Sequence, residues 1–317
     1  MNIDNPQATA SNRAEVHYLR DEQVASPGRA EGGGFSSVSG LRDRGAGHLG
    51  IKAILLLLVA VLIFMLAYPL ISSWEFFEQI PLRNWLSFDW RPNVGAFGFG
   101  TALAGSFLLV LMALPLSLLA GWFVSVQLVD NRRSWLNPVI VSVLEVWISL
   151  PSVIIGIWAI IEVIPLVRDT FGGTGYSLLA ATIGLTIFIT PTCTLLFYRS
   201  YLTHLDEYQG LESSFQMTVL SRSELFIKSQ PTAVIGTINY IFCRVFGETM
   251  VVLMLSGNSV QVPGGLLEGF RSLTATIALE MSYATGMHET ALFALATAGI
   301  VIILTVLLAQ YRRLANA

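Results

Sequence analysis

An arginine and a glutamate lie four positions apart inside an otherwise apolar stretch of this 317-residue chain, at Arg244 and Glu248. If a helix begins near Pro231, Arg244 lies roughly 18–20 Å along it, at a rise of about 1.5 Å per residue. That depth is close to the middle of a hydrocarbon layer about 30 Å thick, where a lone charge costs at least ~2.5 kcal/mol. A spacing of four places both side chains on one helix face, so each charge can partly neutralise the other.

Two interpretations of this pair differ in what they predict. A buried ion pair can simply fix the packing of helices. Alternatively, Arg244 offers a charge-assisted fork to a tetrahedral oxyanion, and Glu248 occupies that fork when no substrate is bound. We favour the second interpretation, because charged groups inside a membrane domain face the bundle interior or a water-filled path and mark substrate pathways.

Two further polar residues are candidates for the same pathway. Thr249 could donate a hydrogen bond to an anion, although hydroxyls in membrane helices more often bond to their own backbone. Glu145 precedes Pro151, and a proline frees backbone carbonyls and breaks a helix. For Glu145, pairing with another side chain and lining of the pathway are equally open. Glu280 is expected near the outer mouth of the pathway.

The amino-acid composition indicates whether these residues lie in a soluble protein or in a membrane protein. Hydrophobic residues make up 54% of the chain and charged residues only 12%, whereas a soluble domain carries about 25% charged residues. This balance excludes a soluble enzyme, a nucleic-acid binder and a disordered protein. Apolar runs of roughly 18 or more residues indicate a bilayer. We therefore expect an all-α integral membrane protein surrounded by lipid.

The apolar pattern divides the chain into two parts. Residues 1–50 contain no apolar run and are predicted to form a flexible cytoplasmic tail. Residues 51–317 are predicted to form a transmembrane domain, in which Trp74, Trp85 and Trp90 suit a membrane interface. Residues 262–279 are Gly-rich and short, which is typical of a re-entrant or interfacial piece. The six predicted spans are residues 51–71, 97–126, 135–167, 178–198, 231–255 and 291–310.

The basic residues favour one orientation of these spans. With the N-terminus inside, thirteen basic residues face the cytoplasm, four face outside, and Arg244 is the remaining one. Because inner loops carry the excess of Lys and Arg, both termini are predicted to be cytoplasmic. The outer residues are Arg83, Arg91, Arg168 and Arg271. The inner residues are Arg13, Arg20, Arg29, Arg42, Arg44, Lys52, Arg132, Arg133, Arg199, Arg222, Lys228, Arg312 and Arg313.

Several chemistries have no signal in the sequence. The chain lacks a phosphate-cradling glycine-rich loop followed by Lys-Ser or Lys-Thr, so it is not expected to bind ATP in that way. It shows no nucleophile–base constellation and no metal-ligand spacing among its 4 histidines. Cys193 and Cys243 lie in apolar stretches and are expected to be small core residues. We therefore expect no catalytic residue, metal or cofactor in this chain itself.

Four segments carry a resemblance to a known family. Residues 244–254 read Arg-Val-Phe-Gly-Glu-Thr-Met-Val-Val-Leu-Met and are followed by Gly257-Asn258. This segment resembles the fifth-span signature of PstC-type permeases, the membrane subunits of the bacterial phosphate ABC importer. Residues 86–90, 145–158 and 272–280 resemble further motifs of that family in the same order, so the resemblance runs from about Ile51 to the C-terminus.

The resemblance implies a fold and a set of partners. The fold is that of a type I ABC importer permease, with six transmembrane helices in each subunit. A second homologous permease subunit pairs with it, an ABC ATPase dimer below holds ATP and magnesium, and a periplasmic phosphate-binding protein delivers the substrate. Arg244 and Glu248 match the family positions implicated in phosphate passage. The implied location is the bacterial inner membrane, with no nucleic acid involved.

The longest cytoplasmic loop departs from the family pattern. ABC importer permeases carry Glu-Ala-Ala, three residues, Gly, nine residues and Ile-x-Leu-Pro in a coupling helix that enters a cleft on the ATPase. Here Thr218 stands where the glycine belongs, and a β-branched residue resists the positive φ that glycine allows. The loop backbone is therefore expected to differ. The residues that align with the motif are Glu212, Ser213, Ser214, Thr218 and Pro231, of which Glu212 and Pro231 match outright, in a loop of about 199–230.

These observations lead to one main hypothesis and three alternatives. The main hypothesis is a permease subunit that translocates inorganic phosphate, driven by partner ATPase subunits. The same architecture could carry another oxyanion, sulfate or molybdate, because the pair at Arg244 and Glu248 recognises charge and shape only coarsely. The departures in the coupling loop also allow a degenerate permease that acts as a regulatory or scaffolding membrane subunit. An ATP-independent secondary transporter is the third alternative.

Overall fold

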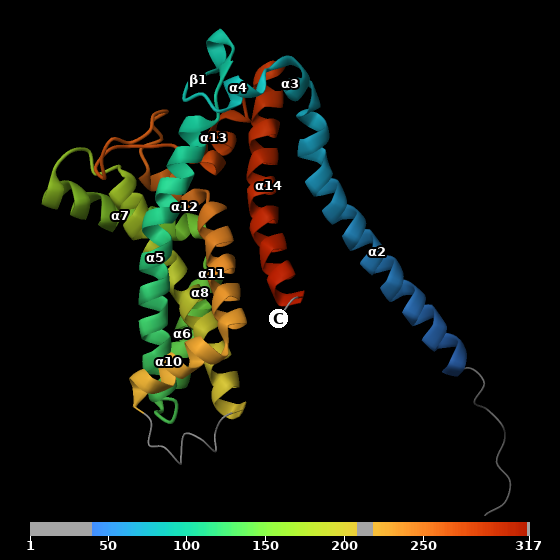
Figure 1. The fold of residues 1–317 in the computed structure, drawn as a ribbon, viewed down its shortest axis with the longest axis vertical. Helices are drawn as coiled ribbons and strands as arrows, with labels where there is room; N and C mark the ends of the chain where they lie inside the picture. Colours follow the sequence, from blue (N-terminus) through green and yellow to red (C-terminus); the bar gives the residue numbers. More distant parts are fainter. Residues whose placement is uncertain (1–39, 208–217, 316–317) are drawn as a thin grey trace, which may run out of the picture. The chain divides into compact units, whose positions relative to one another are not determined.

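Helices form nearly all of the regular structure (Figure 1). The computed structural model describes residues 40–207 and 218–315. A short antiparallel hairpin pairs Trp90 with Phe97. In chain order the elements are α2 (Gly40–Ser72), α3 (Trp74–Gln79), α4 (Leu82–Trp85), β1 (Trp90–Arg91), η2 (Pro92–Val94), β2 (Ala96–Phe97), α5 (Gly100–Asp130), α6 (Leu136–Ser149), α7 (Ser152–Phe171), α8 (Leu178–Glu207), α10 (Val219–Ser229), α11 (Pro231–Phe246), α12 (Met250–Leu255), α13 (Leu273–Glu280) and α14 (Met287–Ala315).

The chain divides into two compact units, Met1–Ala60 and Val61–Ala317. The described part of the first unit is the N-terminal portion of α2. Its apolar side chains are exposed, with Leu56 at 70%, as expected of a helix that is hydrophobic all round and meets lipid. The first span is predicted to begin at Ile51, whereas α2 already begins at Gly40. The division into a tail of residues 1–50 and a membrane domain stays a prediction.

The described part of the chain contains four helices that are long and apolar enough to cross a membrane. They coincide with the first, second, fourth and sixth predicted spans. α6 and α7 together provide a fifth candidate. The prediction of a mostly helical chain with several candidate membrane spans is therefore confirmed, whereas the number six and the orientation stay predictions. The four helices are Gly50–Gln79, Gly100–Asp130, Leu178–Leu205 and Met287–Arg312.

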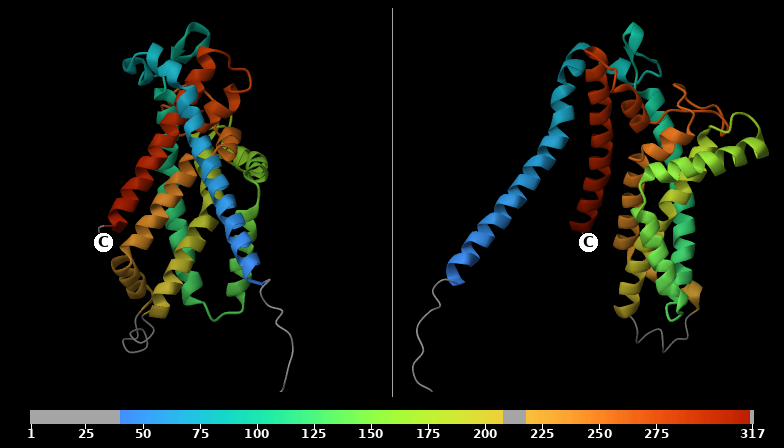
Figure 2. Two further views of the ribbon diagram at one scale, coloured as in Figure 1. Left: turned by 90° about the vertical axis from the view of Figure 1, so that its right-hand side faces the viewer. Right: turned by 180° about the vertical axis from the view of Figure 1, so that it is seen from behind.

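The third predicted span is not one straight helix. α6 ends at Ser149, α7 begins at Ser152, and the two are bent by 98° (Figures 1 and 2). Leu150 between them has extended backbone angles, φ −68° and ψ 137°, because the ring of Pro151 clashes with a helical conformation of the residue before it. The proline also lacks the N–H that would continue the hydrogen-bond ladder. The sequence therefore predicted the break but not the size of the bend.

Small residues let the helices of the second unit approach closely. A Cβ built on Gly121 of α5 would lie 2.7 Å from Sγ of Cys193 in α8. A Cβ on Gly184 of α8 would lie 2.3 Å from Cδ1 of Leu255 in α12. Such contacts between small residues are typical of membrane helices, whose association depends on close packing. Figure 2 shows α5, α8 and α11 running side by side, with α12 following α11.

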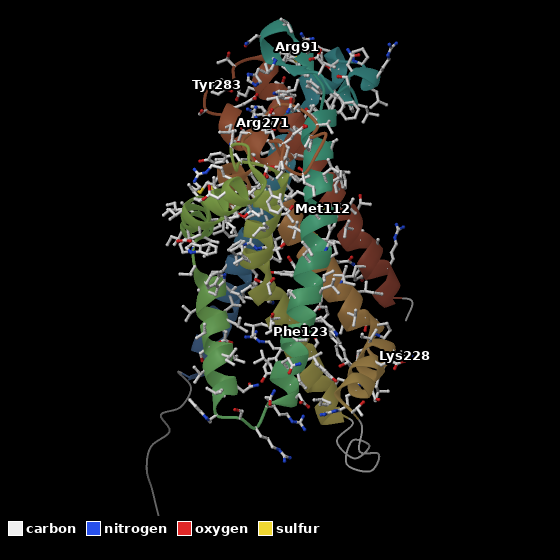
Figure 3. The ribbon with its side chains drawn as sticks, turned by 90° about the vertical axis from the view of Figure 1, so that its left-hand side faces the viewer. Arg91, Met112, Phe123, Lys228, Arg271 and Tyr283 are labelled. Atoms are coloured by element: carbon white, nitrogen blue, oxygen red, sulfur yellow. The ribbon has the colours of Figure 1, made fainter. Side chains whose placement is uncertain are left out.

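Three of the basic residues used to predict the orientation lie at opposite ends of the second unit. Figure 3 shows Arg91, Arg271 and Tyr283 at one end and Lys228 at the other. The predicted orientation requires this separation, because Arg91 and Arg271 were assigned to the outer side and Lys228 to the inner side. Trp90 is buried within the protein, with 6% of its surface exposed, and its location at a membrane interface stays a prediction. Its indole N–H donates to Glu280 inside the protein, which satisfies the polar atom of this buried side chain.

Candidate functional site

The predicted fifth span is divided into two helices in the structure. α11 ends at Phe246 and α12 begins at Met250. The amide of Glu248 donates to the carbonyl of Val245, 3.3 Å away, so the i to i−4 pattern of an α-helix is lost here. The prediction of one continuous helix was wrong. Gly247 occupies the break, and a glycine inside a helix costs about 0.5–1 kcal/mol relative to alanine.

Arg244 and Glu248 form an ion pair across this break. Nη1 of Arg244 lies 2.9 Å from Oε2 of Glu248. The Glu248 side chain is 3% exposed and that of Arg244 39%, so the carboxylate is buried while part of the guanidinium stays open. The guanidinium also lies 4.9 Å from the ring centre of Phe188 in α8, within the range of a cation–π contact. The structure thus joins the two residues that the sequence paired, although Glu248 lies beyond the end of α11.

This geometry can present a positive charge to an anion. A guanidinium carries five N–H donors in a planar fork, and the contact with Glu248 engages Nη1. An oxyanion that reaches the open part of Arg244 can therefore bind before the carboxylate is displaced. Exchange of one anion for another keeps Arg244 paired. The displaced Glu248, however, is 3% exposed and must then find another hydrogen-bond donor or a proton, because an unpaired buried carboxylate is strongly unfavourable.

The other two predicted pathway residues have partners of their own. Oγ1 of Thr249 donates to the carbonyl of Gly247 at 3.4 Å. The hydroxyl therefore bonds to the local backbone, which is the alternative to binding an anion. Glu145, near the end of α6, accepts a hydrogen bond from Nη2 of Arg199 in α8 at 2.7 Å. This pair borders a cavity of about 310 Å³. Glu145 is thus paired with a side chain and also lines a cavity, and its role in a pathway stays a prediction.

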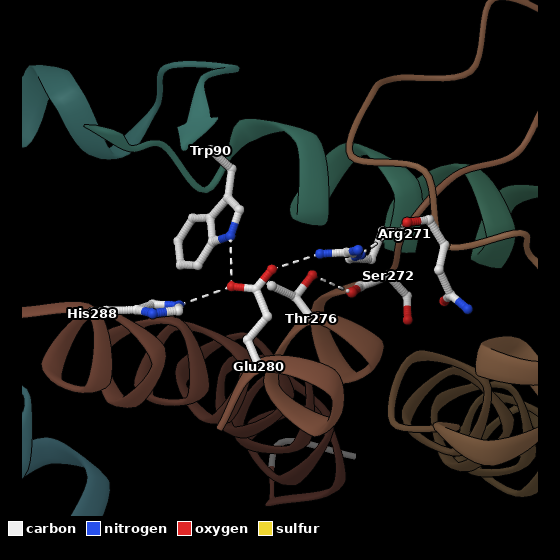
Figure 4. Close-up of polar contacts among 7 residues, drawn as sticks. Trp90, Arg271, Ser272, Thr276, Glu280 and His288 are labelled. Atoms are coloured by element: carbon white, nitrogen blue, oxygen red, sulfur yellow. Dashed lines mark hydrogen bonds and ion pairs between the residues drawn. The ribbon is translucent and has the colours of Figure 1, made fainter. Parts of the chain in front are cut away.

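A second buried carboxylate, Glu280 at the end of α13, meets three polar partners (Figure 4). Nη1 of Arg271 lies 2.6 Å from Oε1, and Nε1 of Trp90 lies 2.9 Å from Oε2. Nε2 of His288 also lies 2.8 Å from Oε2. The Glu280 side chain is 6% exposed. Sequence reasoning missed this cluster, because Trp90 is 190 positions from Glu280 and no local pattern links them.

The Glu280 cluster borders a cavity of about 490 Å³ at the same end of the unit. Arg91 on its wall donates to Asp89 at 2.6 Å, and this hydrogen bond holds the pKa of the Asp89 carboxyl below its usual value. Tyr283 is 64% exposed, and partial desolvation raises the pKa of its hydroxyl, as does the nearby Glu280 carboxylate. Tyr283 is therefore a hydrogen-bond donor at neutral pH. The cavity combines arginine, histidine and tyrosine donors with a carboxylate that is already fully bonded.

Comparison with known proteins tests the resemblance. The chain is 24% identical over 266 residues to the phosphate transport system permease protein PstC of Pasteurella multocida, covering 74% of this chain and 82% of that protein. It is 25% identical over 280 residues to the PstC protein of Xylella fastidiosa strain 9a5c, covering 80% and 86%. It is 28% identical over 238 residues to the probable ABC transporter permease protein YqgH of Bacillus subtilis, covering 72% and 74%. The chain is a relative of the PstC-type permeases. No protein-family model matches it.

The structure describes part of the segment that aligns with the coupling motif. Thr218 is the N-cap of α10, with φ −69° and ψ 160°, and its Oγ1 accepts a hydrogen bond from the amide of Ser221 at 3.3 Å. The left-handed turn that a glycine would allow is not formed at this position, in agreement with the expected difference in backbone. Pro231 is the first residue of α11. Three aligned residues lie outside the described part of the chain: Glu212, Ser213 and Ser214.

α10 is held firmly against the ends of two long helices. Phe226 is fully buried, and its ring centre lies 4.8 Å from that of Tyr201 in α8 and 5.7 Å from that of Trp122 in α5. Arg222 donates to Asp130 at the end of α5 at 2.9 Å. Because close-packed side chains transmit displacement, a movement of α10 acts directly on both α5 and α8.

Proposed function

We propose that this chain is the membrane-spanning permease subunit of an ABC importer that carries inorganic phosphate across the bacterial inner membrane. The ion pair of Arg244 and Glu248 at the α11–α12 break carries this proposal, and the names of the PstC relatives support it. Phosphate is a tetrahedral oxyanion whose oxygens match the planar fork of a guanidinium. In the resting state the carboxylate of Glu248 pairs with the guanidinium of Arg244. Phosphate replaces this carboxylate during passage, and the return of Glu248 to Arg244 releases phosphate.

In this proposal ATP hydrolysis takes place in partner subunits, and the chain is a transport subunit rather than an enzyme. A second homologous permease subunit completes the pathway. An ABC ATPase dimer holds ATP and magnesium, and a periplasmic phosphate-binding protein delivers the substrate. α10 and the loop before it contact the ATPase, and Phe226 and Arg222 pass the movement to α5 and α8. The chain needs no cofactor of its own.

We also propose six crossings with both termini in the cytoplasm. The bent pair of α6 and α7 makes the third crossing, and α11 with α12 makes the fifth. The distribution of basic residues supports this arrangement, as does the separation of Arg91 and Arg271 from Lys228 (Figure 3).

The Arg244→Gln variant tests the proposal directly. Glutamine keeps a polar side chain but loses the charge and the fork. Loss of charge-assisted hydrogen bonds worth about 3 kcal/mol corresponds to roughly a hundredfold lower uptake. The measurement is uptake of phosphate, sulfate and molybdate by the reconstituted complex, at equal complex yield.

The matched control is Arg168→Gln, because Arg168 pairs with Asp169 at 2.9 Å in an exposed position on α7. This control should keep normal uptake, because exposed ion pairs contribute little. Normal phosphate uptake by Arg244→Gln would remove the proposed role of the pair. Selective uptake of sulfate or molybdate by the unsubstituted complex would replace phosphate as the substrate.

A regulatory or scaffolding membrane subunit is the second candidate function. The extended N-cap conformation of Thr218, where the coupling motif has glycine, is the observation that favours it. Co-purification separates the two candidates. Retention of an ATPase whose turnover is stimulated by loaded binding protein supports transport, and the absence of any retained ATPase supports the regulatory function.

A further inference from the structure

Glu280 connects segments that are far apart in the chain. Its carboxylate meets Arg271 from the loop before α13, Trp90 from β1 and His288 from α14. Burial of a carboxylate is unfavourable unless hydrogen bonds replace water, and here three donors surround the two oxygens (Figure 4). The side chain of Arg271 is itself only 17% exposed, so both partners of this ion pair are fixed in place.

Arg271 continues the network to the far end of α12. Its Nε donates to the carbonyl of Asn258 at 3.1 Å, while its Nη1 holds Glu280. The side-chain amide of Asn258 in turn donates to the carbonyl of Leu253 in α12 at 2.8 Å. Asn258 has a positive φ of 52°, a conformation that asparagine tolerates better than most residues. One guanidinium therefore ties the C-terminal end of α12 to the Glu280 cluster.

α13 holds the other end of α12. Oγ1 of Thr274 donates to the carbonyl of Glu248 at 2.9 Å, at the break itself. α13 is braced on α5, since the amide of Leu273 donates to Oγ of Ser106 at 2.8 Å. Gly105 permits this close approach, because a Cβ there would lie 2.5 Å from the carbonyl oxygen of Arg271.

We infer that Glu280 and Arg271 are positioning residues for the anion-binding pair of Arg244 and Glu248. They act through the two ends of α12: Thr274 fixes the backbone of Glu248 at one end, and Asn258 fixes the other. Loss of the Glu280 charge releases Arg271, and α12 can then shift relative to α11. The inference rests on the proposed function for its consequence in transport. The effect on the helix break does not depend on what is transported.

Cys243 is a native reporter of the break, since it is partly exposed and precedes Arg244 in the last turn of α11. Cys193 is fully buried and is replaced by alanine, so that N-ethylmaleimide labels Cys243 alone in the detergent-solubilised full chain. Glu280→Gln and Arg271→Lys should each change the labelling rate more than threefold. Lysine retains the charge but cannot hold Glu280 and Asn258 together through a rigid fork. The matched control, Glu289→Gln, changes an exposed glutamate beside the cluster and should label as the unsubstituted chain does.

Transport supplies the second readout. Phosphate uptake by the reconstituted complex should fall about tenfold in Glu280→Gln and recover partly in Glu280→Asp, which restores the carboxylate. In an Arg244→Gln background, Glu280→Gln should cause no further loss of phosphate uptake. A residue that acts only by positioning Arg244 has no effect once Arg244 is absent.

Labelling of both variants within twofold of the control would overturn the inference, whatever the uptake. A further loss in the Arg244→Gln background would also overturn it. Retention of uptake by Arg244→Gln alone would instead remove the proposed function, while the labelling test of the helix break would still stand. If Glu280→Gln fails to assemble, Arg271→Lys still provides the labelling test.

Discussion

Glu248 and Arg244 share one ion pair but differ in exposure, at 3% and 39% of their side-chain surfaces. A carboxylate buried to that extent loses most of its hydration, and its contact with Arg244 offsets the cost. The same contact must break each time an anion takes its place. In the proposed function Glu248 is therefore a competitor of the substrate as well as a partner of Arg244.

The Glu248→Gln variant tests this competition. It keeps the shape of the side chain but leaves Arg244 without a competing charge. Phosphate should bind the solubilised complex about tenfold more tightly, as expected if one charge-assisted hydrogen bond of about 1.5 kcal/mol no longer competes. Uptake should slow, because no carboxylate returns to displace the anion. Equilibrium binding of radiolabelled phosphate checks the affinity, with Glu75→Gln, at an exposed position in α3, as control. Weaker binding in Glu248→Gln would contradict the competition.

At the scale of elements, the close packing of α5 against the segment before α13 depends on one small residue, Gly105. A Cβ at Gly105 would lie 2.5 Å from the backbone carbonyl oxygen of Arg271 and 2.9 Å from Cδ2 of Phe270. A backbone atom cannot rotate away as the end of a side chain can, so a larger residue must push α5 and the segment before α13 apart. That displacement would reach the Glu280 cluster.

The Gly105→Val variant is therefore expected to be less stable. Overpacking costs about 1–3 kcal/mol, which should lower the melting temperature of the solubilised chain by several degrees. Uptake should fall as well. The control is Gly265→Val, because a Cβ at Gly265 meets nothing within 4 Å. An unchanged melting temperature in Gly105→Val would show that α5 and this segment are less closely packed than the structure has them.

At the scale of the whole molecule, the proposed orientation places two exposed basic residues on opposite sides of the membrane. The side chains of Arg91 and Lys228 are 68% and 73% exposed, and they lie at opposite ends of the second unit (Figure 3). The proposed transport, driven by an ATPase in the cytoplasm, requires α10, which carries Lys228, to face that ATPase.

Single cysteines at these two positions test the orientation. In a chain with Cys193→Ala and Cys243→Ala, a membrane-impermeant maleimide added to intact cells should label Arg91→Cys. It should label Lys228→Cys only after the cells are permeabilised. Labelling in the reverse order would place both termini outside and would remove α10 as the ATPase contact.

The sequence by itself determined the membrane class, the positions of the long apolar helices and the pairing of Arg244 with Glu248. Each of these depends on local information: hydropathy is read along a single segment, and a spacing of four residues lies within one turn of backbone. Pro151 likewise predicted a break between α6 and α7, because its effect is confined to its neighbours.

Only the tertiary structure decided the 98° bend, the division of the fifth predicted span and the surroundings of Glu280. Trp90 and Glu280 meet across 190 positions of the chain, and Thr274 reaches the carbonyl of Glu248 from a different helix. Periodicity and propensity carry no information about such contacts, because they arise when separate segments pack together. The pair that we propose to bind an anion can thus be recognised along the chain, whereas the residues that we infer to position it become visible only in the folded protein.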